Sequence, residues 1–103
     1  MAAPLLPVIA RIPVGAAGDY VLDLAAASDG AALVAATSGG AVVAIDATAA
    51  GGGSVPPTRL VGRHGGAVTA CVLEGTTILT SSLDGTVAVW DARADGGAGP
   101  AQR

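Results

Sequence analysis

Few side chains in this sequence have the chemistry of an active site. His64 is the only histidine, Cys71 is the only cysteine, and Ser82 offers a hydroxyl as a further candidate nucleophile. A histidine that activates a thiol or hydroxyl also needs a third group to orient it. The pattern offers none beyond Asp84, for which we infer a structural role below. We therefore expect no catalytic residues and no enzymatic activity.

The same residues are too few for a metal or cofactor site. One histidine and one cysteine do not form a zinc ligand set. The glycine-rich stretch at 51–57, GGGSVPP, could be mistaken for a phosphate-binding loop. Such a loop needs a lysine followed by serine or threonine, and the sequence contains no lysine. We expect no metal and no cofactor, and we interpret 51–57 as a linking loop.

Charge and hydropathy narrow the classes of partner. Five basic residues against eight acidic ones give a net charge of −3, so we expect no nucleic-acid partner. The apolar N-terminus is interrupted by Pro4, Pro7 and Pro13 and lacks a basic region, so we expect no signal peptide and no membrane span. Together with a lone cysteine, this indicates an intracellular protein, cytoplasmic or nuclear. A cleaved organelle-targeting peptide remains the alternative.

Composition and periodicity predict short strands. Of 103 residues, 16 are glycine and 6 are proline, and the aromatic residues are one Trp and one Tyr. Short elements and a thin core follow. Residues 32–46, ALVAATSGGAVVAID, align with residues 77–91, TILTSSLDGTVAVWD, at an offset of 45. That period is typical of a four-stranded propeller blade.

The strands of the second copy can be placed from β-branched residues. They are predicted at 68–73, 78–82 and 86–90, and a short strand at 59–61 would complete the first copy. The pair Asp84-Gly85 predicts a type I′ hairpin turn between the last two strands. In the first copy Gly39-Gly40 occupies the corresponding place.

The segments LVGRHGGAVTAC (60–71) and ILTSSLDGTVAVWDAR (78–93) resemble the WD-repeat family. The match covers about a third of the chain, and residues 20–46 match only in pattern. Arg63 stands where the family usually has a glycine before the histidine. The resemblance implies an all-β fold made of two WD-type four-stranded blades of an incomplete β-propeller.

The resemblance also implies a division of the chain. Residues 1–18 form an N-terminal segment with a candidate propeller-closing strand at 8–14, and residues 19–62 form a degenerate blade. Residues 63–95 form a second blade without its outer strand, and residues 96–103 form a disordered tail. Two blades leave apolar faces uncovered, so we expect a fragment, a truncated gene model or a subunit that must assemble.

Blades of this family often share a hydrogen-bonded set of side chains. Here the resemblance implies His64, either Thr80 or Ser82, Asp84 and Trp90. The carboxylate can accept from imidazole, imidazole can meet a hydroxyl, and the hydroxyl can accept from the indole N–H. Buried polar groups are costly when unpaired, so we interpret this set as a structural clamp.

The first copy lacks most of this set. At the offset of 45, Ile45 replaces the tryptophan and Gly39 replaces the aspartate, while Thr37 aligns with Ser82. The position of the histidine falls near Asp19 and Tyr20. Removing several members together is milder than removing one, so this blade can be stable as an apolar unit.

Two functions follow from the resemblance. The first is a non-catalytic scaffold for protein–protein interaction, with other proteins as partners. The second is a substrate-receptor subunit of a cullin-type ubiquitin ligase, because Trp90-Asp91-Ala92-Arg93 resembles the motif that docks on the ligase adaptor. In that case Arg93 would be the docking residue, whereas an ordinary solvated arginine at a strand end is the alternative.

Overall fold

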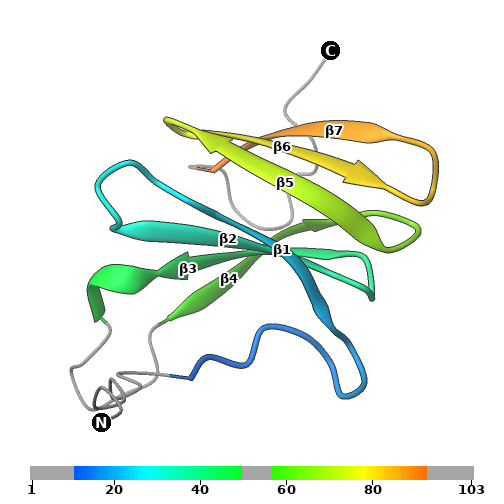
Figure 1. The fold of residues 1–103 in the computed structure, drawn as a ribbon, viewed down its shortest axis with the longest axis horizontal. Coiled ribbons are helices and arrows are strands. Elements are labelled where there is room, and N and C mark those ends of the chain that lie inside the picture. Colours follow the sequence, from blue (N-terminus) through cyan, green and yellow to red (C-terminus); the bar gives the residue numbers. More distant parts are fainter. Residues whose placement is uncertain (1–10, 50–56, 93–103) are drawn as a thin grey trace, which may run out of the picture.

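The chain folds into two antiparallel β-sheets (Figure 1). The computed structural model describes residues 11–49 and 57–92. The first sheet has the order β1-β2-β3-β4, and the second has the order β5-β6-β7. The strands and one short 3-10 helix are β1 (Val21–Ala26), β2 (Ala32–Thr37), β3 (Ala41–Asp46), η1 (Ala47–Ala49), β4 (Thr58–Arg63), β5 (Val68–Glu74), β6 (Thr77–Ser82) and β7 (Val87–Asp91). The described part is all-β, and it contains no helix long and apolar enough to cross a membrane.

The strand predictions for the second copy are confirmed to within one residue at each end. The strand predicted at 59–61 is also confirmed and extends over Thr58–Arg63 as β4. The all-β expectation is confirmed, with four strands in the first sheet and three in the second among the described residues, whereas the assignment of these sheets to blades stays a prediction. The tail expected at 96–103 lies outside these residues.

The prediction of a strand at 8–14 is wrong for residues 11–14, the part of it that the structure describes. Residues 8–10 lie outside it, and residues 11–14 form no strand. Pro13 has no backbone N–H to donate to a sheet, which explains the failure in physical terms. The apolar side chains Ile12 and Val14 instead pack on one face of β2 and β3.

The turn between β6 and β7 also differs from the prediction. A type I′ turn needs positive φ at both central residues, but only Gly85 has it, at 88°. Gly85 donates its N–H to the carbonyl of Ser82 at 3.1 Å, and the backbone N–H of Ser82 donates to the carbonyl of Thr86 at 3.1 Å. This is a three-residue loop that closes on a left-handed glycine. Gly40, with φ of 92°, plays the same part between β2 and β3.

The two sheets pack face to face, with β5 lying against β1 and β2. Their shared core is made of small and β-branched side chains around one tryptophan. Its buried members are Val34, Ala36, Val42, Val61, Val68, Cys71, Ile78, Ala88 and Trp90. Such a core buries little area per residue, so each large side chain in it contributes a large share of the burial energy.

Polar contacts also join the sheets, at Cys71 of β5. Its backbone N–H donates to Asp23 Oδ2 of β1 at 2.9 Å, and its thiol donates to the carbonyl of Val34 at 3.5 Å. The hydrogen bond from Cys71 lowers the pKa of Asp23, with a second one from Leu24. Burial, and then the charge of Asp23, raises the pKa of the Cys71 thiol to about 11. The cysteine is therefore a neutral core residue.

Trp90 sets a steric requirement on β4. A Cβ atom built on Gly62 would overlap the six-membered ring of Trp90, so the indole packs directly on the glycine backbone. Trp90 is 2% exposed, and its ring has no room to move aside. This contact explains why β4 contains a glycine at its next-to-last position.

We therefore expect Gly62→Ala to lower the free energy of unfolding by about 1–3 kcal/mol, the usual cost of overpacking a core. Gly65→Ala is the matched control, because a Cβ at Gly65 meets its nearest atom at 3.7 Å. Urea unfolding of the wild type and both variants measures the difference. Equal midpoints for the two variants would contradict the packing of Trp90 on Gly62.

Candidate functional site

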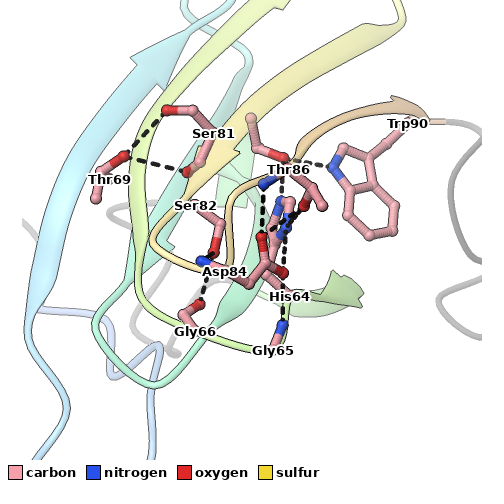
Figure 2. A network of polar contacts seen from close by, with 10 residues as sticks. His64, Gly65, Gly66, Thr69, Ser81, Ser82, Asp84, Thr86 and Trp90 are labelled. Atoms are coloured by element: carbon pink, nitrogen blue, oxygen red, sulfur yellow. Dashed lines mark hydrogen bonds and ion pairs between the residues drawn. The ribbon is translucent and has the colours of Figure 1, made fainter.

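The residues of the predicted clamp come from four places in the second half of the chain (Figure 2). His64 follows β4 directly, Thr80 lies in β6, Trp90 lies in β7, and Asp84 lies in the turn between them. Thr80 and Trp90 project from the same face because Thr80 is opposite Ala88 and alternate residues of a strand share a face. They are thus diagonal neighbours across two strands, within reach of each other.

The Thr80 hydroxyl is the centre of the network. Trp90 Nε1 donates to Thr80 Oγ1 at 2.8 Å, and His64 Nε2 lies 2.7 Å from the same oxygen. The indole can only donate, and the hydroxyl has one proton of its own. That proton has an acceptor if His64 Nε2 is unprotonated. The pattern therefore assigns the direction Trp90 to Thr80 to His64.

The second nitrogen of His64 points to the turn. His64 Nδ1 lies 3.1 Å from Thr86 Oγ1 and 3.3 Å from Asp84 Oδ2. With Nε2 unprotonated, Nδ1 carries the proton and donates to these oxygens. The imidazole also meets the indole of Trp90 edge to face, with ring centroids 5.8 Å apart. Its side chain is 3% exposed, so the ring is enclosed as well as fully hydrogen-bonded.

Asp84 ends the chain of hydrogen bonds and also shapes the turn. It accepts from the Thr86 hydroxyl at 2.6 Å, from the Gly65 N–H at 2.9 Å and from the Thr86 N–H at 2.9 Å. These bonds, the Thr86 hydroxyl first, lower the pKa of Asp84 well below its usual range, and the contact with His64 acts in the same direction. The carboxylate is thus held in its charged form.

Ser82 bonds to the backbone of Asp84 but does not contact His64 or Trp90 through a hydrogen bond. Its hydroxyl donates to the Gly66 carbonyl at 3.1 Å and accepts the Asp84 N–H at 3.1 Å. Of the two hydroxyls left open by the sequence, Thr80 is the one between imidazole and indole. Sequence reasoning missed Thr86, although an aspartate two residues before a threonine is a known local hydrogen-bonding pattern that could have indicated it. Arg93, the expected docking residue, lies outside the described residues.

The first sheet has an apolar arrangement at the equivalent places. Ile45 is 5% exposed and packs with Ala35, which stands 45 residues before Thr80. Asp19, 45 residues before His64, places its carboxylate over Gly39, in the space that an aspartate side chain would need there. Thr37 accepts the Ala41 N–H at 3.0 Å and so holds the turn from within. In the first sheet the carboxylate thus comes from Asp19, before β1, whereas in the second it comes from Asp84, in the turn between β6 and β7.

The polar groups of the network are engaged in hydrogen bonds. Within residues 11–49 and 57–92, no buried side-chain nitrogen or oxygen lacks a hydrogen-bond partner, and no three potential metal ligands come together. Both nitrogens of His64 are engaged by hydroxyl or carboxylate oxygens, while the Cys71 thiol donates to a backbone carbonyl. The arrangement can hold a loop to a sheet.

Comparison with known proteins gives no independent identification. No protein-family model matches the chain. A search of curated proteins also finds no match.

Removing the Thr80 hydroxyl should be costly. Thr80→Val keeps the side-chain shape but leaves the Trp90 N–H and the His64 Nε2 without their partner, at a cost of about 1–3 kcal/mol in the free energy of unfolding. Thr80→Ser keeps the hydroxyl and loses one methyl group, for which we expect about 1 kcal/mol. Chemical denaturation distinguishes them. If Thr80→Ser is as destabilised as Thr80→Val, burial of the methyl and not the hydrogen bonds is decisive.

We expect Asp84→Ala to lower the melting temperature at neutral pH more than Asp29→Ala. Asp84 accepts several hydrogen bonds, whereas Asp29 accepts one, from the Ala31 N–H, in an exposed turn. Because folding lowers the pKa of Asp84, its contribution is complete above the usual aspartate pKa of about 3.9 and is lost as the pH falls below it.

The measurement is a series of melting curves from neutral to acid pH. The gap between the wild type and Asp84→Ala should narrow below about pH 4. A gap that does not change with pH, or equal shifts in the Asp84 and Asp29 variants, would show that the carboxylate of Asp84 does not stabilise the fold.

Proposed function

We propose that this chain is a non-catalytic scaffold for protein–protein interaction of the WD-repeat type. The observation that carries the proposal is the saturated chain of hydrogen bonds through Trp90, Thr80 and His64. Because each buried group in it already has a partner, its chemistry is that of a structural clamp. A fold held in this way can present loops without being changed by what they bind.

The arrangement of the two sheets supports a propeller of which the chain supplies two blades. Both sheets are antiparallel meanders, in which β2 and β6 begin 45 residues apart and β3 and β7 end 45 residues apart. The turns after β2 and β6 each close on a glycine with positive φ, at Gly40 and Gly85. Propellers are built from antiparallel sheets that repeat at this period and stack face to face.

The surface best suited to a protein partner is the row of loops next to the clamp. The β2–β3 turn, the β4–β5 connection and the β6–β7 turn lie at one end of the molecule, on the right of Figure 1. Two large side chains are exposed there: Leu83 in the β6–β7 turn is 75% exposed, and Tyr20, bonded to Ser38 of the β2–β3 turn, is 72% exposed. Exposed apolar side chains on rigid loops are typical of binding sites.

The proposal can be tested by capture of partners on the full chain with quantitative mass spectrometry. Leu83→Asp should reduce capture by about tenfold or more, because it places a charge in the centre of the contact. Glu74→Ala, at the exposed β5–β6 turn, is the control and should capture as the wild type does. Equal capture by Leu83→Asp and wild type, with both folded, would overturn the assignment of this surface.

The receptor role in a cullin-type ubiquitin ligase is a second candidate. The observation that favours it is the sequence Trp90-Asp91-Ala92-Arg93 at the end of β7. An arginine can pair bidentately with a carboxylate on the adaptor. Arg93→Ala should weaken adaptor binding by about 30-fold, equivalent to 2 kcal/mol, with an unchanged melting curve. Binding that is absent in the wild type, or equal in both, would leave the general scaffold.

A further inference from the structure

One face of the second sheet is turned away from the first sheet (Figure 1), and the side chains on it are mainly apolar and partly exposed. We call it the open face, and it consists of Ala70, Val72, Leu79, Val87 and Val89. Val87 is 72% exposed, Val72 is 49% exposed and Leu79 is 38% exposed. These side chains lie on three adjacent strands, since Val72 pairs with Leu79 and Leu79 pairs with Val89. Ser81, which pairs with Ala70 and with Val87, is a polar residue on the same face. An exposed and mainly apolar sheet face of this kind indicates a contact surface.

The 45-residue offset shows what the open face corresponds to. Ala70 pairs with Ser81 as Asp23 pairs with Ala36, so the offset between β1 and β5 is 47 and Ala70 corresponds to Asp23. The other residues of the open face lead to four apolar residues on the contact face of the first sheet: Val72 to Ala25, Leu79 to Val34, Val87 to Val42 and Val89 to Ala44. All four of these residues belong to the cluster that packs against the second sheet. The open face therefore has the positions that, one repeat earlier, bind a neighbouring sheet.

The same offset identifies the complementary surface. The face of the second sheet that meets the first carries Ile78, Thr80, Ala88 and Trp90, whose equivalents 45 residues earlier are Leu33, Ala35, Val43 and Ile45. These form the far face of the first sheet, which Ile12 and Val14 cover. Within the described residues, each chain thus has one sheet-on-sheet contact between its own two sheets and an open face with no sheet against it. It also has a far face that Ile12 and Val14 cover.

A competing sheet can displace Ile12 and Val14, the side chains that cover the far face. Residues 11–14 form no strand, and Ile12 and Val14 are themselves only half-buried. A whole sheet would bury more apolar surface there than two side chains do. The four named residues of the far face and the five of the open face are uncharged, so the contact between them buries no charge. The acidic residues Glu74 and Asp91 pair with Thr77 at the end of the open face, beside these residues.

We propose that the open face binds the far face of the first sheet in a second copy of this chain. The contact repeats, between molecules, the sheet-on-sheet contact within one molecule. It is heterologous, because the two surfaces are different, so each added copy offers a new open face. Growth beyond two copies follows from this geometry. The inference rests on the two sheets and not on the proposed partner-binding loops.

The test is sedimentation velocity on the full chain from about 5 to 500 µM. The average mass should increase with concentration to beyond two copies of the 9.7 kDa chain. Leu79→Asp, on the open face, should weaken assembly by about 100-fold or more, because a carboxylate would be buried without a partner. Leu83→Asp is the control: it introduces the same charge at a more exposed leucine in the turn, and it should assemble as the wild type does.

A mixing experiment tests the direction of the contact. A fluorescent Leu79→Asp chain still has an intact far face, so it should bind to the open face of wild-type assemblies and shorten them. A wild type that stays at 9.7 kDa throughout overturns the proposal, as does assembly that Leu79→Asp does not weaken. Assembly that stops at two copies and excludes the labelled variant overturns the head-to-tail contact. Loss of partner capture in Leu83→Asp with unchanged assembly separates this inference from the proposed function.

Discussion

The buried indole N–H of Trp90 is the constraint from which the second half of the structure follows. It has one acceptor, Thr80 Oγ1, at 2.8 Å. An indole placed in this core without that acceptor would lose the hydrogen bond it makes with water in the unfolded chain. Thr80 must therefore face the core, which fixes which residues of β6 are buried. Gly62 is required on the other side, where the ring packs on β4.

His64 extends this constraint from the core to the turn. The hydroxyl that accepts from Trp90 must give its own proton to an acceptor, and His64 Nε2 is 2.7 Å away. The imidazole then connects to Asp84 and Thr86, so hydrogen bonds link the buried tryptophan to the β6–β7 turn. In a core with so few large side chains, polar bonds of this kind stabilise what apolar burial alone would leave loose.

The two sheets solve the same packing problem in different ways. The first has Ile45 and Ala35 where the second has Trp90 and Thr80, so it needs no buried acceptor. Both sheets keep a glycine at the end of the turn, at Gly40 and Gly85, because that backbone conformation is needed whatever the side chains are. The two copies thus share the backbone conformation of this turn and the arrangement of apolar residues on the two faces of each sheet.

Much of this could be predicted from the sequence, for identifiable reasons. β-branched alternation located the strands of the second copy, and the resemblance to the WD-repeat family indicated that His64, Asp84 and Trp90 belong together. The choice between Thr80 and Ser82 was not accessible, because both hydroxyls lie in one strand and only the packing of Trp90 selects Thr80.

The other differences arise from geometry that local patterns do not specify. The Asp-Gly pair indicated a turn but not its length, and an extra residue, Leu83, changed its type. The apolar run at 8–14 resembled a strand, yet among the described residues it only covers a sheet face, as Pro13 cannot donate a ladder hydrogen bond. The correspondence between the far face of the first sheet and the open face of the second could not be predicted, because it depends on which residues of each sheet are buried.

The directed hydrogen bonds from Trp90 through Thr80 to His64 are the central claim, and the tautomer of His64 tests them most directly. Long-range ¹H–¹⁵N correlation spectra of the imidazole of the folded chain distinguish a protonated from an unprotonated ring nitrogen. The account requires the neutral ring with its proton on Nδ1, since Nε2 accepts from Thr80. A proton on Nε2 would leave the Thr80 hydroxyl facing two donors with no acceptor for its own proton, and it would contradict the account.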